Sequence, residues 1–160
     1  MGREIERKFL VTGTAWKDGL HGRLFRQGYL SLEKSRTVRV RAAEDAAWLT
    51  IKGATAGCTR AEYEYPIPVA EAHELLDTLC IRPLVEKTRY EVRYGGHLWQ
   101  VDEFHGANAG LVVAEIELGR EDEAFERPPW LGAEVSSDPR YFNVNLVNHP
   151  FREWRERGHS

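Results

Sequence analysis

The sequence predicts a mainly β protein with flanking helices, of the α+β class. Eight antiparallel strands are expected to close into a barrel that forms a tunnel with a charged interior. Most of the chain alternates apolar and polar residues at period two, which is typical of strands that bury one face. The connections between these stretches are too short for parallel crossovers. A length of 160 residues, 42% of them hydrophobic, predicts one compact domain over residues 1–160.

The alternating stretches give eight predicted strands. Turn signals separate them: the glycines of Tyr94-Gly95-Gly96-His97 are typical of a hairpin, and Gly53 to Gly57 interrupts another pair of stretches. The approximate bounds, in chain order, are 3–11, 25–33, 36–43, 47–53, 60–67, 84–94, 97–104 and 111–119.

Helical periodicity is confined to short stretches. The clearest is 69–80, where apolar residues recur at three- and four-residue spacing after a proline. Weaker patterns predict helices near 143–149 and near 121–127. We expect 136–149 to close one mouth of the barrel and the polar tail after Trp154 to be frayed.

The composition argues against several functional classes. A net charge of −3 provides no overall positive field for nucleic acid or an anionic membrane surface. No apolar run approaches the roughly 20 residues that span a bilayer, and the N-terminus lacks a signal-peptide core. We therefore expect a cytoplasmic protein without membrane or nucleic-acid partners. Cys58 and Cys80 show no metal-binding spacing and are expected to be free thiols.

Charges of one sign recur on single strand faces. Glu4 and Glu6 share a face with Lys8, two further strands carry Glu-x-Glu, and two others carry Arg-x-Arg or Lys-x-Arg. Each strand alone could simply present a solvent-exposed face. Like charges on one face are destabilising, however, unless opposite charge lies between them. An eight-stranded barrel has an interior wide enough for one small ligand, so these faces are expected to point inward.

Such an interior has a defined chemistry. Carboxylates suit Mg²⁺ or Mn²⁺, and we expect two ions. The acids are Glu4, Glu6, Glu62, Glu64, Asp102, Glu115 and Glu117. Clustered arginines and lysines suit a chain of phosphoryl groups. These bases are Lys8, Arg39, Arg41, Lys52, Lys87 and Arg89. No glycine-rich phosphate loop is present, and nothing is dedicated to a nucleobase or sugar.

Several motifs carry a resemblance to a known family. The segment Glu4-Ile5-Glu6-Arg7-Lys8-Phe9 resembles the ExExK signature of the CYTH, or triphosphate tunnel metalloenzyme, superfamily. Later blocks follow in the family's order, including Thr37-Val38-Arg39-Val40-Arg41 and Ala114-Glu115-Ile116-Glu117-Leu118. The resemblance implies a tunnel in which the acids hold metal and the bases hold phosphates. The residues expected to act in catalysis are Glu4, Glu6, Lys8, Lys52 and Tyr29.

In overall look the chain is most similar to the stand-alone bacterial inorganic triphosphatases. The leading expectation is metal-dependent hydrolysis of inorganic tripolyphosphate, a small-molecule substrate, to pyrophosphate and phosphate by a monomer or homodimer. Fold alone does not choose among the family's activities. The alternatives are a class IV adenylyl cyclase that makes cyclic AMP from ATP, a thiamine or nucleoside triphosphatase, a module that binds polyphosphate or nucleotides, and a structural β-protein.

Overall fold

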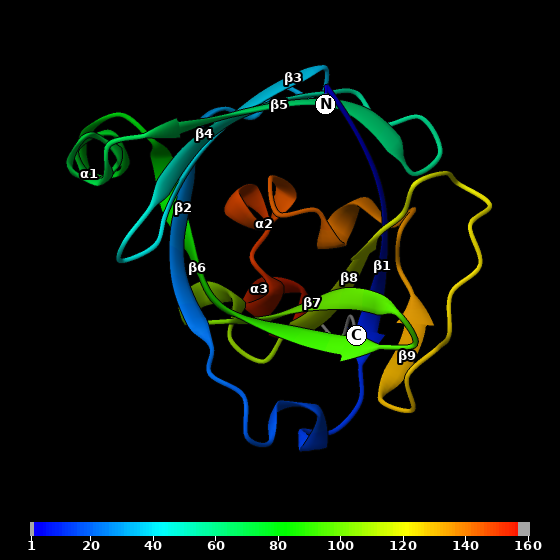
Figure 1. Ribbon diagram of the computed structural model, residues 1–160. Helices are drawn as coiled ribbons and strands as arrows, with labels where there is room; N and C mark the ends of the chain where they lie inside the picture. Colours follow the sequence, from blue (N-terminus) through cyan, green and yellow to red (C-terminus); the bar gives the residue numbers. More distant parts are fainter. Residues whose placement is uncertain (1, 157–160) are drawn as a thin grey trace.

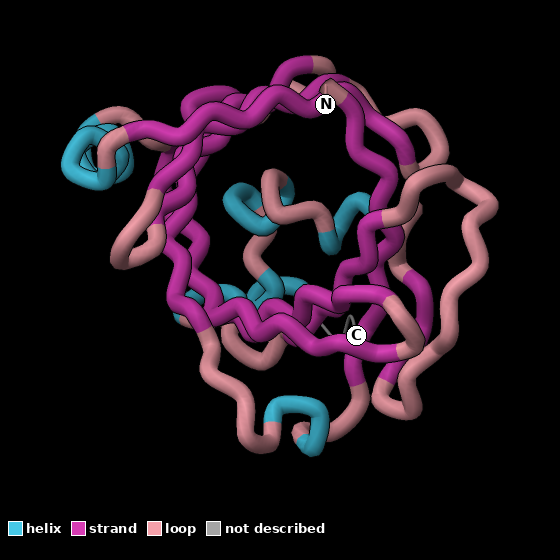
Figure 2. The backbone as a smooth tube through the Cα atoms, viewed as in Figure 1, coloured by secondary structure: helices cyan, strands magenta, loops and turns pink. Residues whose placement is uncertain are grey.

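The computed structural model describes residues 2–156 and shows a closed antiparallel barrel (Figures 1 and 2). Within those residues one sheet runs in the order β5-β4-β3-β2-β6-β7-β8-β1, a further pairing of β5 with β1 closes it, and β9 adds to the edge of β1. The strands are β1 (Arg3–Val11), β2 (Arg23–Ser31), β3 (Arg36–Ala42), β4 (Ala47–Gly53), β5 (Thr59–Ile67), β6 (Ile81–Tyr94), β7 (His97–Phe104), β8 (Val112–Glu117) and β9 (Leu131–Glu134).

The predicted barrel and its eight strands are confirmed, with bounds that shift by up to three residues. Strand β9 was not predicted, because four residues with two exposed positions give too little alternation to stand out. Strand β1 closes the barrel by pairing along its first residues with β5 and from Glu6 onward with β8. At the junction the Glu6 amide donates to the Cys58 carbonyl, at 3.0 Å.

Helix α1 (Val69–Thr78) covers part of the outer wall, as the apolar outward faces require. Ala72 and Leu76 are fully buried against Val40 and neighbouring residues of β3 and β4. The helix ends two residues before the predicted limit, where the Leu79 and Cys80 amides both donate to the Leu75 carbonyl. Cys80 and Cys58 are free thiols, as expected.

The predicted helix over 121–127 is wrong. This segment is a turn followed by irregular chain, which runs along the outside of the barrel (Figure 1). Seven residues are too few to stabilise an isolated helix, so tertiary contacts decide the conformation. Phe125 packs edge-on against Phe9 and Trp99, and Glu123 accepts a hydrogen bond from the Gly119 amide.

The C-terminal segment closes one end of the barrel with an apolar plug, as predicted for 136–149. It comprises the 3₁₀ turn η3 (Pro139–Tyr141), α2 (Asn145–Asn148) and α3 (Phe151–Glu156), which lie within the ring of strands in Figure 1. Leu146 and Val147 are buried with inward-facing apolar residues such as Tyr29 and Val85. The expected frayed tail concerns residues beyond Trp154; α3 extends to Glu156, and 157–160 lie outside the described residues.

The apolar plug should contribute strongly to stability. Leu146 is fully buried, so Leu146→Ala should lower the free energy of unfolding by about 2–4 kcal/mol, from lost burial and the cavity left behind. Urea denaturation would measure this. Leu79→Ala is the matched control, because Leu79 is 64% exposed and its truncation should cost under about 0.5 kcal/mol. Equal losses in the two variants would contradict a packed plug.

Candidate active site

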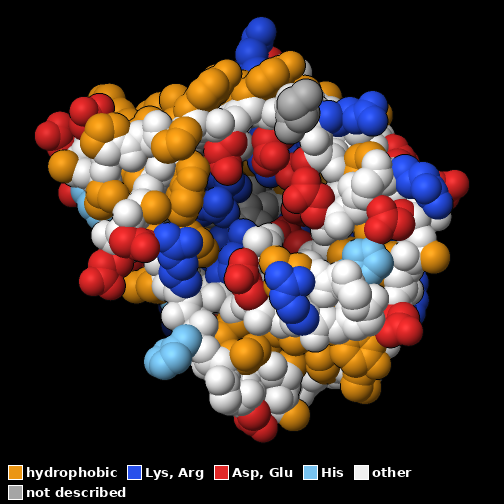
Figure 3. All heavy atoms as spheres, in the orientation of Figure 1, with side chains coloured by type: hydrophobic (Ala, Val, Ile, Leu, Met, Phe, Trp, Pro, Cys, Tyr) orange, Lys and Arg blue, Asp and Glu red, His pale blue; other side chains and the backbone are white. Residues whose placement is uncertain are grey.

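The inner wall of the barrel surrounds a polar cavity of about 210 Å³. Figure 3 looks into its open end, where acidic and basic side chains line the hollow. Among the described residues, seven cations and six acids line it. The cations are Lys8, Arg39, Arg41, Lys52, Arg60, Lys87 and Arg89, and the acids are Glu4, Glu6, Glu62, Glu64, Glu115 and Glu117. Of the residues predicted for the site, only Asp102 does not line the cavity.

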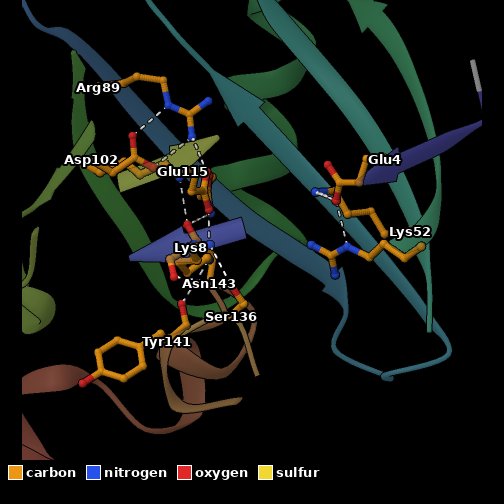
Figure 4. Close-up of polar contacts among 12 residues, drawn as sticks. Glu4, Lys8, Lys52, Arg89, Asp102, Glu115, Ser136, Tyr141 and Asn143 are labelled. Carbon is orange, nitrogen blue, oxygen red and sulfur yellow. Dashed lines mark hydrogen bonds and ion pairs between the residues drawn. The ribbon is translucent and has the colours of Figure 1, made fainter. Parts of the chain in front are cut away.

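Glu4 lies at the junction of β1 and β5, where two cations share one of its oxygens. Its Oε1 accepts from Lys52 Nζ and from Arg60 Nε, each at 2.8 Å (Figure 4 labels Glu4 and Lys52). Burial raises the pKa of Glu4, but the two cations outweigh it and hold the pKa at about 2. Lys52 also contacts Glu62, at 3.4 Å. Glu4 is therefore a fully ionised carboxylate engaged by cations.

Lys8 connects the cavity to the plug. Its Nζ lies 2.9 Å from Glu115, its partner in the β1–β8 register, and donates to the Tyr141 carbonyl at 3.3 Å (Figure 4). Burial disfavours the charged form of Lys8, but Glu115 and Glu6 raise its pKa above the usual value. Lys8 is therefore a protonated ammonium group near the floor of the cavity.

Asp102 lies on the inner face of the barrel but is buried among its partners and does not line the cavity. Its two oxygens accept from Arg89 Nε and Nη2 at 2.7 and 2.8 Å, and Lys87 Nζ lies 2.8 Å away. Burial raises the pKa of Asp102, yet Arg89 and Lys87 together hold it at about 2. Lys87 also donates to Asn143 of the plug, at 2.8 Å. The role of Asp102 as a metal ligand stays a prediction; its geometry is that of a group that positions two cations.

Glu6, like Glu117, has no hydrogen bond or ion pair from a described residue to its carboxylate. Burial, followed by the charges of Glu115 and Glu4, raises its pKa to about 7. Burial also raises the pKa of Glu62, as does the charge of Glu4. Crowded carboxylates with raised pKa values are the donor set that a hard divalent cation would stabilise. The residues present therefore fit Mg²⁺ or Mn²⁺ chemically.

Several of the other carboxylates are nevertheless engaged by cations as they stand. In residues 2–156 no three histidine, cysteine, aspartate or glutamate side chains are arranged to hold a metal ion directly. Glu4 and Glu115 are each paired with two cations. The same is true of Glu64, which lies 3.5 Å from Arg39 and 3.9 Å from Arg41. Metal binding here would require cations to leave these acids.

Arg39 and Arg41 of β3 carry guanidinium donors that have no hydrogen-bond acceptor in the described part of the chain. The Nε atoms of Arg39 and Arg41 are buried and have no acceptor among the described residues. Burial, together with the charges of Arg39 and Arg89, lowers the pKa of Arg41 to about 9. Buried unpaired guanidinium donors are costly. An anion that accepts their hydrogen bonds would remove this cost.

Tyr29 lines the cavity as predicted, whereas two further site residues, Arg60 and Asn143, were not predicted. Tyr29, which was predicted, lies 3.5 Å from Gln27 Nε2, and burial raises the pKa of its phenol. Arg60 was missed, although it shares the inward face of β5 with Glu62 and could have been found by the same period-two argument. Asn143 accepts from Lys87 and Gln27. It lies in the plug, where no periodicity marks which side chains face the cavity.

Comparison with known proteins gives a consistent family assignment. The CYTH domain matches residues 2–150. A protein of Acetivibrio thermocellus named inorganic triphosphatase is 51% identical over 98% of this chain and 100% of its own length. One of Nitrosomonas europaea with the same name is 41% identical over 90% and 96%. A crystal structure described as an inorganic triphosphatase has a TM-score of 0.64 and 38% identity, covering 89% of this chain and 96% of its own.

A more distant solved structure shows the same fold only. A Hippeastrum protein described as an adenylyl cyclase candidate with dominant triphosphatase activity has 14% identity and a TM-score of 0.58, over 73% of this chain and 80% of its own. No helix in residues 2–156 has the length and apolar character needed to cross a membrane.

The raised pKa of Glu6 predicts a pH-dependent effect on stability. The folded protein keeps this proton up to a pH of about 7, whereas the unfolded chain loses it near pH 4.5. Ionisation of Glu6 thus costs folded-state stability as the pH rises from about 4.5 to 7. In EDTA at pH 8, Glu6→Gln should be more stable than wild type by roughly 1–2 kcal/mol, a value discounted for solvent in the cavity.

Thermal unfolding in EDTA at pH 4 and pH 8 would measure this difference. The stabilisation by Glu6→Gln should vanish at pH 4, where the native glutamate is already protonated. A variant that is less stable than wild type at pH 8 would show that the carboxylate has a favourable partner.

Asp102 should matter for stability because it neutralises two buried cations. Asp102→Asn should destabilise the protein by about 3 kcal/mol, the usual cost of leaving buried charge without its partner. Asp77→Asn is the matched control, because Asp77 pairs with Arg26 at an exposed position and should cost under about 1 kcal/mol. Chemical denaturation would compare the two, and a loss below 1 kcal/mol for Asp102→Asn would argue against this role.

Proposed function

The chain belongs to the CYTH domain family, and we propose that it is a divalent-metal-dependent inorganic triphosphatase. It hydrolyses tripolyphosphate to pyrophosphate and phosphate inside the barrel. The relatives that share 51% and 41% identity over most of their length are named inorganic triphosphatases, which supports this activity over the others in the family. A cytoplasmic location and a monomeric or homodimeric state stay predictions.

The observation that carries the proposal is the buried cationic wall with two unsatisfied guanidinium donors, Arg39 Nε and Arg41 Nε. A chain of phosphoryl groups offers many acceptor oxygens and forms charge-assisted hydrogen bonds with arginine. The cavity of about 210 Å³ is smaller than the roughly 300–1,000 Å³ of sites for drug-sized ligands. Its size and polar lining favour an inorganic polyphosphate over a molecule with a nucleobase or thiazole ring.

Phosphoryl transfer depends mainly on positioning and on stabilising charge. We infer that Arg39, Arg41 and Arg89 orient the phosphate chain and stabilise the charge that develops on its oxygens. Lys8, held at the floor by Glu115 and the Tyr141 carbonyl, would contact the deepest phosphoryl group. Lys87, fixed by Asp102 and Asn143, would contact it from β6.

The remaining predicted residues fit complementary roles. Glu4, Glu6, Glu62, Glu64, Glu115 and Glu117 would hold Mg²⁺ or Mn²⁺, with two ions expected, which supply Lewis-acid chemistry at the phosphoryl oxygens. The raised pKa of Tyr29 keeps its phenol a hydrogen-bond donor. With Lys52 it would orient the attacking water or a phosphoryl oxygen. Water attacks the terminal phosphorus, the bridging P–O bond breaks and pyrophosphate leaves, and the proton lost by the water would pass to a carboxylate of the cavity.

Phosphate release from tripolyphosphate, ATP and thiamine triphosphate, each with Mg²⁺, Mn²⁺ or EDTA, would test the proposal. Tripolyphosphate should be hydrolysed fastest, and EDTA should abolish turnover. Glu6→Gln should lower kcat by about 10²-fold or more, because an electrostatic contact at the reacting centre is lost. Glu74→Gln, on the exposed face of α1, is the matched control and should keep wild-type activity.

The other activities give distinct results in the same assay. Cyclic AMP formed from ATP would identify an adenylyl cyclase. Faster hydrolysis of thiamine triphosphate or ATP than of tripolyphosphate would identify the organic triphosphate as the substrate. Binding of tripolyphosphate without any turnover would indicate a binding module.

A further inference from the structure

Arg60 is a cation of the cavity to which no role has been given so far. It lies on β5, faces inward with Glu62, and lines the same cavity as the predicted phosphate-binding residues. Its Nε donates to Glu4 Oε1 at 2.8 Å. The charge of Arg60 also acts on Lys8 and Tyr29, where it partly opposes the other influences that raise the pKa of both groups. Arg60 therefore contacts the acidic side chain of Glu4 while it lines the same cavity as the cations of the site.

Two cations contact the same oxygen of Glu4, and they are not equivalent. Lys52 is almost buried, with 10% of its side chain exposed, and has Glu62 as a second partner at 3.4 Å. Arg60 keeps 24% of its side chain exposed and has Glu4 as its only ion-pair partner among the described residues. Glu4 would remain paired with Lys52 if Arg60 left. Arg60 is thus the cation that can be exchanged at least cost.

We propose that Arg60 is a substrate-binding residue that occupies Glu4 in the ligand-free protein and transfers to the phosphate chain when a divalent cation takes that carboxylate. The inference rests on the proposed function and deepens it. A metal ion and a guanidinium group compete for Glu4, and the released guanidinium forms forked hydrogen bonds with phosphoryl oxygens. Each ligand then frees a partner for the other, so metal and triphosphate bind with positive coupling.

The charge balance of the cavity supports this exchange. Its lining carries seven cations and six acids, and most of these charges are paired with one another. A metal ion alone or a polyanion alone therefore has to break ion pairs that nothing replaces. When both bind, every displaced charge finds a new partner. If the Arg60–Glu4 ion pair were purely structural, removing Arg60 would not be expected to strengthen metal binding and weaken tripolyphosphate binding at the same time.

The test is calorimetric and needs no turnover. Mn²⁺ is titrated into ligand-free protein, and a non-hydrolysable imido analogue of tripolyphosphate, which stands for tripolyphosphate in this test, is titrated separately into protein saturated with Mn²⁺, for wild type and Arg60→Gln. Removing the competing cation should lower the Mn²⁺ dissociation constant by about fivefold or more. Losing the phosphate contact should raise the tripolyphosphate dissociation constant by about tenfold. These opposite changes are the signature of the exchange.

Two further variants serve as controls. Arg60→Lys keeps the charge, so its Mn²⁺ constant should stay close to that of wild type, and its loss of tripolyphosphate affinity should be smaller than that of Arg60→Gln. Arg36→Gln makes the same change on the outer face of β3, where Arg36 pairs with Glu33 at exposed positions. It should alter neither constant. Thermal unfolding of each variant would verify folding.

The outcomes separate this inference from the proposed function. Arg60→Gln with unchanged Mn²⁺ affinity would overturn the exchange, and unchanged affinities for both ligands would reduce Arg60 to a structural residue, while the triphosphatase assignment stood. A wild-type protein that binds neither Mn²⁺ nor tripolyphosphate would instead refute the proposed function itself.

Discussion

The register between neighbouring strands is the constraint on which the site depends. Lys8 lies opposite Glu115, Arg89 opposite Asp102, and Lys52 opposite Glu62, because each pair occupies matching positions in adjacent antiparallel strands. A slip of one residue in any strand would turn its charged side chains to the outside and bring apolar ones inward. The ion pairs are therefore products of strand pairing, and the hydrophobic outer faces that fix the register also fix the electrostatics of the cavity.

The inner face of the barrel is apolar near the plug and charged further along the same strands. Inward positions near the plug are apolar, as with Tyr29 and Val85, and pack against Leu146 and Trp154. Inward positions further along the same strands, such as Lys87 and Arg89, are charged. Hydrophobic burial at one end thus supplies the stability that an interior filled with charges would otherwise lack. Outside, α1 and the segment carrying Phe125 cover much of the remaining apolar wall.

Period-two alternation was enough to predict the strands and the face of nearly every candidate residue. It could not show that Asp102 is covered by its partners, since alternation gives the side of the sheet but not how deeply a side chain is buried. It also could not predict that Asn143 contacts Lys87, because the plug reaches the cavity through long-range packing. The 121–127 segment was predicted wrongly for a related reason: its conformation is set by the packing of Phe125 onto the barrel wall.

The plug also determines how substrate can enter the barrel and how products can leave it. Because Tyr141, Val147 and Trp154 fill one end with apolar side chains, a charged ligand has to enter and leave at the other end. The fragment formed deepest in the cavity is then held behind the fragment nearer the mouth until the latter departs. The order of product release would then follow from the closed end of the barrel. The outer fragment would leave through the same open end by which new substrate enters.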